Sequence, residues 1–304
     1  MPDTSFAQRQ TPEPGEIFLD HVGWYVPDID QAGAAFERLG FTLTPFTPHT
    51  HESASGERTR SGTANRCAMI ELGYLEILCA VPDLDTPLTA ELEAGLERYT
   101  GLHLIAFTCA DAASEHVRIA QAGFTPRPIV NLRRPLTTDD GAEAMTAFSV
   151  LRLPPGEMAE GRIQMLTQET PDTVWQPSLI ARDNAIDALS GVVVCTDDVV
   201  DSAARFARLL GRAATGDGTA AEIALDRGRV SFVSPGALTT LIPGAAVPAD
   251  PFIAAVVLRS HDIRASRDYL TSRGLAIREA AGALMVEAMG ASVVIHGHDE
   301  VWPL

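Results

Sequence analysis

The sequence predicts an α+β fold in which one βαβββ unit occurs four times and the units pair into two similar domains. The first observation is residues 19–28, a mostly apolar and aromatic strand pattern stopped by a Pro-Asp turn and followed by a helical pattern. The second is residues 102–111, which repeat this design with a histidine at the same place. The third is that two further units, opening at Leu189 and Phe252, show the same element order. Repeats of this size indicate a modular architecture.

Length and composition agree with two globular domains. At roughly 150 residues per domain, a chain of 304 residues fits two. Its 46% of apolar residues is enough for sizeable cores. The formal net charge of −17 argues against nucleic acid or an anionic membrane as a partner, because both require clustered Lys and Arg. A small-molecule substrate is the expected partner, and a homodimer is left open.

Cysteine usage and the N-terminus indicate a cytoplasmic protein. The four cysteines form no CxxC pair and lie in or beside apolar strand patterns, which is typical of reduced, buried thiols. The N-terminal segment is polar and lacks the apolar region of a signal peptide. No apolar stretch reaches about 20 residues, so no membrane span is expected.

The pattern divides the chain into an arm and two domains. Residues 1–15 are rich in polar residues, Pro and Gly and are expected to form a flexible arm. The predicted N-terminal domain covers residues 16–180, with modules at 16–82 and 101–168. The predicted C-terminal domain covers residues 185–304, with modules at 187–235 and 251–298.

Two polar stretches inside the N-terminal domain are interpreted as loops. The first runs from about Pro45 to Gly62, and its His49 and His51 are expected to be exposed. The second follows a strand expected near residues 125–130. It contains Arg133 and Arg134, which are interpreted as solvated charges.

Equivalent positions of the four modules separate the two domains chemically. Two positions of the module are compared. The first lies early in the opening strand and carries His21 in the first module and His103 in the second. The second lies in the closing strand, three residues after the turn glycine or its equivalent, and carries Glu76 in the first module and Gln164 in the second. In the C-terminal modules the same positions carry Gly191, Ser231, Ala254 and Val293, which cannot coordinate a metal as a set. The C-terminal domain is therefore expected to be a degenerate copy.

Strand geometry explains how the N-terminal set could meet. Side chains on one face recur at every second residue, so paired opening and closing strands can aim at one point of a curved sheet. Two imidazoles, a carboxylate and an amide oxygen suit a divalent first-row metal, with open positions for water or substrate. A buried Glu76 without a cation or donors would be costly. The alternative is that the histidines are hydrogen-bonded core residues.

Asn65 and Arg66 are candidate substrate-binding residues. They enter a core strand from the polar loop, and Arg makes strong bidentate contacts with anionic groups. The alternative is a loop-closing hydrogen bond and a surface charge.

The chain resembles the vicinal oxygen chelate superfamily, specifically its glyoxalase-like branch within the group that also holds bleomycin-resistance proteins and extradiol dioxygenases. The resemblance is carried by residues 19–22, 62–66, 73–77 and 101–107. It implies paired βαβββ modules that form a cup around a metal held by His21, Glu76 and His103, with Gln164 either as the fourth ligand or as a residue that contacts the ligands. It leaves Glu76 as the candidate catalytic base, because an amide such as Gln164 cannot take a proton as a carboxylate does.

The resemblance implies a metal-dependent enzyme of lyase or isomerase type, acting on a small oxygenated substrate that chelates the metal. One divalent ion per chain is expected, and Fe, Mn, Zn, Ni and Co remain open. An Fe(II) dioxygenase of extradiol or other type, using the N-terminal His/His/Glu set, is the first alternative. A metal-free small-molecule binding protein of the bleomycin-resistance type is the second.

Overall fold

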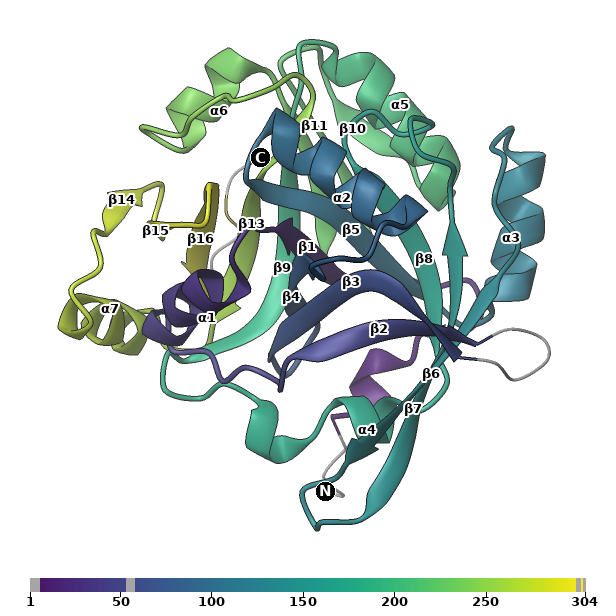
Figure 1. The fold of residues 1–304 in the computed structure, drawn as a ribbon. Coiled ribbons are helices and arrows are strands. Elements are labelled where there is room, and N and C mark those ends of the chain that lie inside the picture. The colour runs from purple at the N-terminus through teal and green to yellow at the C-terminus, as the bar shows by residue number, and fades with distance from the viewer. Residues whose placement is uncertain (1–5, 53–57, 299–301, 303–304) are drawn as a thin grey trace.

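A computed structural model describes residues 6–52, 58–298 and 302, and it confirms the α+β fold with four βαβββ modules (Figure 1). The strands of the described residues join into one hydrogen-bonded, branched sheet. In each module the opening strand pairs in parallel with the closing strand. The opening strands of neighbouring modules pair antiparallel, which joins the modules two by two.

The first module begins with a strand and a well-capped helix. The side chain of Asp28 accepts hydrogen bonds from the backbone N–H groups of Asp30 and Gln31, which satisfies the free donors of the first helical turn. The elements of this module are β1 (Ile17–Tyr25), α1 (Ile29–Arg38), β2 (Thr47–Glu52), β3 (Arg58–Met69) and β4 (Tyr74–Ala80).

The polar stretch expected to be a loop after Pro45 contains strands. It contributes all of β2 and the first residues of β3; residues 53–57 and the side chain of His51 lie outside the described part. Along β3, Ser61, Thr63 and Asn65 are buried on one face. These strands are polar because that face lines a cavity, so polarity here did not indicate a loop.

The second module follows helix α2 (Pro87–Arg98). The strand expected near residues 125–130 begins only at Val130 and continues through Arg133 and Arg134, so the interpretation of these arginines as loop residues was wrong. The elements of this module are β5 (Gly101–Cys109), α3 (Ala112–Gln121), β6 (Val130–Thr137), β7 (Glu143–Arg152) and β8 (Arg162–Gln168).

The C-terminal modules repeat this order after a short connection made of α4 (Pro171–Val174) and the 3₁₀ turn η2 (Pro177–Leu179). The third module comprises β9 (Ile186–Cys195), α5 (Val199–Leu210), β10 (Ala214–Gly216), β11 (Ala220–Ala224) and β12 (Arg229–Val233), followed by α6 (Pro235–Leu241). The fourth comprises β13 (Phe252–Ser260), α7 (Ile263–Ser272), β14 (Arg278–Ala280), β15 (Ala283–Ala288) and β16 (Ala291–Gly297).

The N-terminal modules form a curved sheet with the strand order β2-β3-β4-β1-β5-β8-β7-β6. Helices α1 and α3 pack against this sheet, and α2 packs against β3 and β4. In the C-terminal domain, residues such as Val193, Phe252 and Ala254 form an apolar cluster with Ile242 and Trp302. Ala254 belongs to this cluster, and Gly191 lies two residues before Val193 in β9, on the same face. Hydrophobic side chains therefore fill this face of the sheet in the C-terminal domain.

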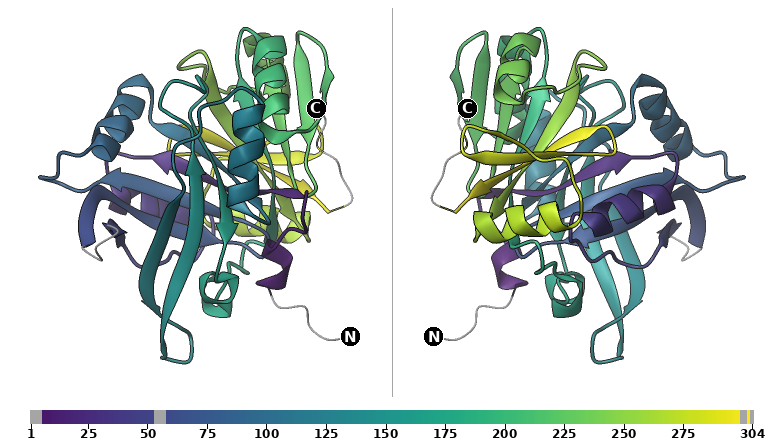
Figure 2. Two further views of the ribbon diagram at one scale, coloured as in Figure 1. Left: turned by 90° about the vertical axis from the view of Figure 1, so that its right-hand side faces the viewer. Right: turned by 90° about the vertical axis from the view of Figure 1, so that its left-hand side faces the viewer.

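The two halves lie side by side, as the views in Figure 2 show for the purple-to-teal and green-to-yellow parts. Strand β13 of the C-terminal half meets β5 at Ile253 and Leu102. The indole N–H of Trp24 donates to the carbonyl of Ala288 at 3.1 Å. Both contacts are buried, so the halves share a packed interface.

Residues 6–15 of the expected flexible arm are docked on the molecule; residues 1–5 lie outside the described part. The docked residues 6–15 include the 3₁₀ turn η1 (Gln8–Gln10). Gln10 is fully buried, donates to the carbonyl of Glu71 at 2.7 Å and accepts from Arg227 at 2.8 Å. The arm therefore links both halves of the chain.

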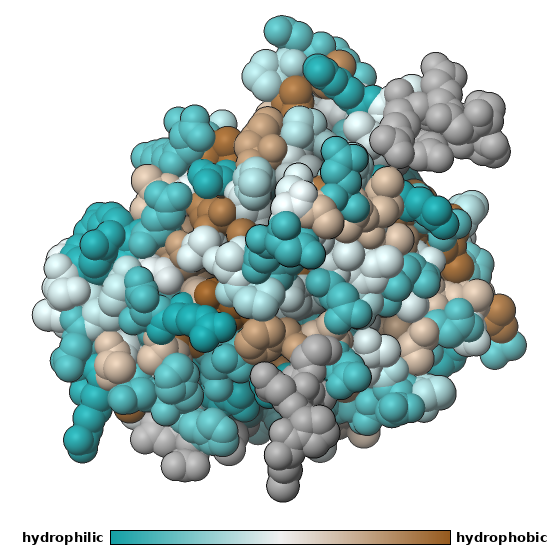
Figure 3. Space-filling view, turned by 90° about the horizontal axis from the view of Figure 1, so that it is seen from below, coloured by the Kyte–Doolittle hydropathy of each residue, from teal (hydrophilic) through white to brown (hydrophobic). Residues whose placement is uncertain are grey.

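The face drawn in Figure 3 is covered mainly by hydrophilic side chains, with hydrophobic residues in small separate groups. Among the described residues, no helix has the length and hydrophobicity needed to span a bilayer.

Candidate functional site

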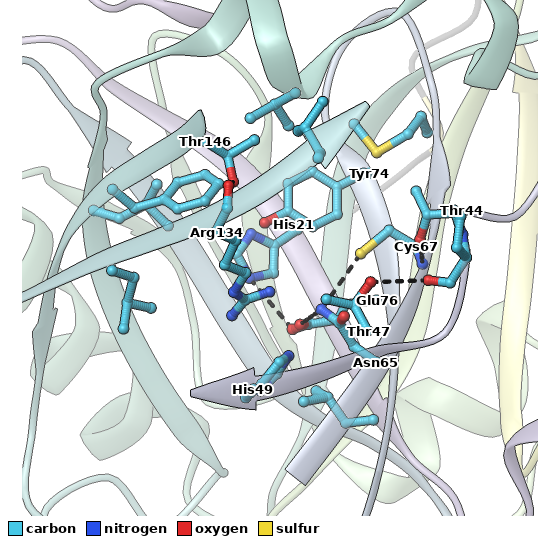
Figure 4. A pocket seen from close by; sticks show the side chains of 18 of the residues that line it. His21, Thr44, Thr47, His49, Asn65, Cys67, Tyr74, Glu76, Arg134 and Thr146 are labelled. Carbon is cyan, nitrogen blue, oxygen red and sulfur yellow. Dashed lines mark hydrogen bonds and ion pairs between the residues drawn. The ribbon is translucent and has the colours of Figure 1, made fainter. Parts of the chain in front are cut away.

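A cavity of about 470 Å³ lies inside the cup of the N-terminal sheet. Its polar residues include His21, Asn65, Glu76 and Gln164, which come from β1, β3, β4 and β8. Figure 4 shows the side chains of His21, Glu76 and Asn65 directed toward one another. A volume of this size suits a small organic ligand.

The orientation of His21 depends on a bulge in β1. Successive side chains of a regular strand point to opposite faces, but the pairing of β1 with β5 shifts register between Leu19 and His21. Asp20 opposes no residue there, and its carboxylate reaches the ring of its neighbour. The Nδ1 atom of His21 lies 2.6 Å from Oδ1 of Asp20. A carboxylate only accepts here, so Nδ1 carries a proton and Nε2 is the ring nitrogen that faces the cavity.

Asp20 is held by two further donors. It is fully buried, and its Oδ2 accepts hydrogen bonds from the hydroxyl of Thr108 and from the amide of Gln168, the latter at 3.1 Å. Burial alone would raise the pKa of Asp20, but the hydrogen bond and charge of His21, with the donors Thr108 and Gln168, lower the pKa below its ordinary value. Asp20 therefore stays ionised and fixes the imidazole.

Three of the predicted ligands lie together. His21 Nε2 is 3.7 Å from Oε2 of Glu76 and 3.4 Å from the amide nitrogen of Gln164. The other carboxylate oxygen of Glu76 accepts a hydrogen bond from Asn65 Nδ2 at 2.6 Å. Oε1 of Gln164 is buried and has no hydrogen-bond partner among the described residues. Amide oxygen and nitrogen exchange by a simple flip, so this oxygen can also face His21.

His103 is not part of this group. The β1–β5 register shifts again between Gly23 and Trp24, which leaves His103 unpaired in β5. Its ring is stacked between Tyr25 and Tyr99, at centroid distances of 4.8 and 3.9 Å, and its Nε2 donates to the carbonyl of Tyr99 at 2.8 Å. Burial lowers the pKa of His103 to about 4, so the ring is neutral. The structure thus does not assemble the four-residue set expected from the sequence.

Arg66 also lies away from the cavity, in contrast to Asn65. Neighbouring residues of β3 point to opposite faces, so only Asn65 can face the cup. The Nε atom of Arg66 donates to the carbonyl of Thr44 at 3.1 Å, and its guanidinium lies 3.7 Å from Glu37 of α1. Arg66, predicted to contact substrate, therefore does not line the cavity, and its side chain instead connects β3 to Thr44 and to helix α1.

The residues that remain fit an open metal site with three donors. Two ligands that share a metal at bonds of about 2.0–2.2 Å lie roughly 3.0–3.5 Å apart, close to the separations around His21 Nε2. The carboxylate behind the histidine is a common outer-shell partner of metal ligands. No group of three or more His, Cys, Asp or Glu that could hold a metal occurs in the described part of the chain. The further potential donor beside His21 and Glu76 is the amide of Gln164.

Several residues in or next to the site were not identified from the sequence as functional. Asp20 does not line the cavity but contacts His21 from behind, and its place directly before His21 was the available signal. His49 was expected to be exposed but lines the cavity, where its Nδ1 lies 3.1 Å from the hydroxyl of Thr63. Burial and the charge of Arg134 keep the pKa of His49 well below its ordinary value.

Three arginines line the same cavity: Arg134 from β6, Arg152 from β7 and Arg162 from β8. Burial and the neighbouring charge of Arg162 lower the pKa of Arg152 to about 9. Strand alternation was the signal for Arg134, because Leu132, Arg134 and Leu136 share the inward face of β6.

Comparison with known proteins identifies the family. The pattern of the glyoxalase-like domain matches residues 19–232. No curated protein matches the chain.

Several solved structures share the fold at low identity. A hypothetical protein from Staphylococcus aureus superposes with a TM-score of 0.64 at 12% identity, covering 92% of this chain and 99% of its own. A mutant of 4-hydroxymandelate synthase from Streptomyces coelicolor gives 0.54 at 14%, covering 96% and 95%. A xylose isomerase-like TIM barrel/4-hydroxyphenylpyruvate dioxygenase fusion protein gives 0.59 at 11%, covering 96% of this chain and 51% of its own. These likenesses show the fold alone.

Proposed function

We propose that this chain, which belongs to the glyoxalase-like domain family of the vicinal oxygen chelate superfamily, is a divalent-metal-dependent enzyme of lyase or isomerase type. The substrate would be a small oxygenated molecule bound in the N-terminal cavity. The observation that carries the proposal is the contact of Asp20 with Nδ1 of His21, which leaves Nε2 of His21 facing Glu76 and Gln164.

His21, Glu76 and Gln164 would hold the ion, and Asp20 would keep His21 in the ligating tautomer. When bound, a divalent metal would supply Lewis-acid polarisation of a substrate oxygen. Glu76 is the group that can accept a proton, since its Oε2 lies beside His21 at the cavity while Asn65 holds its Oε1. Proton removal beside a carbonyl and its return to a neighbouring atom is the reaction type that this arrangement supports.

Elemental analysis after reconstitution tests the metal site. Wild-type protein, His21→Ala and His103→Phe are each loaded separately with Fe, Mn, Zn, Ni or Co and freed of excess ion. We expect about one ion per wild-type chain, loss of that ion in His21→Ala, and retention in His103→Phe. The last variant is the matched control, because it removes a buried histidine that does not line the cavity and keeps a ring between Tyr25 and Tyr99.

The control also distinguishes the two ligand sets. Loss of the ion from His103→Phe with an intact fold would mean that the residues rearrange around metal into the four-ligand set implied by the sequence. Absence of any bound ion in the wild type would contradict the metal-dependent proposal.

A metal-free binding protein is the second candidate. The observation that favours it is the donor set itself, in which only two of three members are residue types that commonly bind transition metals. Such a protein would bind a small molecule in the cavity with the same affinity in the presence and absence of a chelator. An Fe(II) dioxygenase site of the two-histidine, one-carboxylate type would require His103, which the structure places between two tyrosines.

A further inference from the structure

The cavity is positively charged on the side formed by the second module. Strands β6, β7 and β8 each direct one arginine into it: Arg134, Arg152 and Arg162. Among the described residues, only two acidic side chains line the same cavity, those of Glu76 and Asp139. The carboxylate of Asp139 accepts hydrogen bonds from the backbone N–H and the hydroxyl of Ser178. This excess of cations contrasts with the net charge of −17 for the chain.

The charge of Arg152 is poorly compensated. Like Arg134, it forms no ion pair with a carboxylate of the described residues, and the buried Nε atoms of all three arginines have no hydrogen-bond partner among them. Burial and the charge of Arg162 lower the pKa of Arg152 to about 9. Arg162, by comparison, has Glu91 at 3.9 Å. A buried guanidinium without a counter-ion is costly, and the neighbouring charges of Arg162 and Arg134 add repulsion. An anion bound in the cavity would relieve both costs.

The position of Arg152 places such an anion beside the candidate reaction centre. Arg152 pairs with Gln164 across β7 and β8, so their side chains leave the sheet as cross-strand neighbours. Arg162 lies two residues before Gln164 in β8, on the same face. A carboxylate held here would lie one side chain away from the group that faces His21.

The remainder of this wall is apolar. Leu104, Leu132, Phe148, Val150 and Leu166 line the cavity on the strands that carry the arginines and on β5. A ligand that satisfies both features has an anionic end and a hydrophobic body. Inorganic phosphate and small hydrophilic anions would leave the apolar surface uncovered.

We propose that the cavity binds a carboxylic acid with a hydrophobic body, whose carboxylate pairs with Arg152 in the positive field of Arg134 and Arg162. That such an acid is a substrate rests on the proposed function, whereas its binding requires no metal. The planar guanidinium matches a carboxylate in bidentate geometry.

Calorimetric titration in the presence of EDTA tests the proposal without the metal. The probes are benzoate, phenylacetate and 3-phenylpropionate, each compared with its uncharged amide. We expect at least one acid to bind about 10- to 100-fold more tightly than its amide, the range expected for hydrogen bonds to a charged group. Arg152→Met should abolish this preference, and Arg152→Lys should retain part of it.

Arg133→Met is the matched control, because Arg133 lies on the exposed face of β6 next to Arg134. It should bind the acids as the wild type does. Arg152→Gln provides the same readout if the methionine variant does not fold, as judged by circular dichroism.

Three results would overturn the proposal: equal affinity for acid and amide, an unchanged preference in the Arg152 variants, or no binding of any probe by the wild type. Failure of the metal experiment is separate from these. A chain that binds no metal but shows an Arg152-dependent preference for acids would refute the proposed function and support this inference. A chain that binds metal through His21 but shows no preference for acids would support the proposed function and refute this inference.

Discussion

The Nδ1 atom of His21 lies 2.6 Å from the carboxylate of Asp20, its neighbour in the chain. Neighbouring side chains of a strand ordinarily point apart, so this contact exists only because β1 bulges at Asp20. Thr108 of β5 and Gln168 of β8 complete the hydrogen bonds of the carboxylate. The bulge thus converts a sequence neighbour into the group that sets the protonation of His21.

Asp20→Asn should weaken the metal site while keeping the shape of the side chain. An amide can present its oxygen or its nitrogen to Nδ1, so the histidine loses its preference for the tautomer with a free Nε2. We expect metal affinity to fall about 10- to 100-fold, as for other outer-shell substitutions. Metal titration measures the affinity, and ¹⁵N NMR of the imidazole measures the tautomer. Unchanged values for both would contradict the role assigned to Asp20.

Gln164→Glu should strengthen metal binding. The substitution places a second carboxylate near His21 Nε2, where the amide now lies at 3.4 Å. We expect the affinity for a divalent ion to rise about tenfold or more, which corresponds to about 1.4 kcal/mol. Without metal, the variant should unfold at lower temperature, because two carboxylates then share a buried site.

Gln168→Glu is the comparison for that experiment. Gln168 contacts Asp20 and does not line the cavity, so a carboxylate there should lower stability without any gain in metal affinity. Equal metal affinity of wild type and Gln164→Glu would argue that residue 164 is not a ligand.

His103 should make stability depend on pH. Its pKa in the folded chain is about 4, below that of an unfolded histidine, so protons bind preferentially to the unfolded chain. The stabilisation is complete above about pH 6.5 and is lost as the pH falls toward 4, with a total of about 3 kcal/mol. In His103→Phe the slope of unfolding free energy against pH should be smaller by about one proton in this range.

Urea unfolding between pH 4 and 7.5 measures this slope. His261→Gln, which replaces an exposed histidine, should keep the wild-type slope. A His103→Phe protein with the wild-type slope would show that the ring is not held neutral between Tyr25 and Tyr99.

Gly290→Ala should disrupt the contact between the two halves. Gly290 has φ of +80°, and a Cβ there would lie 2.0 Å from the carbonyl oxygen of Thr100, just before β5. Gly156→Ala is the matched control: its φ is +85°, but a Cβ would meet no atom within 4 Å. We expect the control to cost about 1–2 kcal/mol of unfolding free energy from backbone strain alone. Gly290→Ala should cost at least about 2 kcal/mol more from the clash; equal costs in chemical denaturation would contradict this.

The modular fold could be predicted from the sequence. Strand and helix patterns repeat four times because each module must bury one face of its strands and one face of its helix, and this requirement is local. The same repeat singled out His21, Glu76 and Gln164, since equivalent positions of paired modules reach the same cup. A polar segment was wrongly predicted to be a loop where one face of a strand lines the cavity, as for Ser61 and Thr63 in β3 and Arg134 in β6.

Which of the matched residues meet depends on the tertiary structure. His21 and His103 occupy equivalent positions of two similar strands, yet two bulges in the β1–β5 pairing direct one toward Glu76 and leave the other between Tyr25 and Tyr99. The arginines of three successive strands likewise come together only when the sheet curves. Register shifts and sheet curvature depend on contacts between distant segments, so no local sequence pattern predicts them.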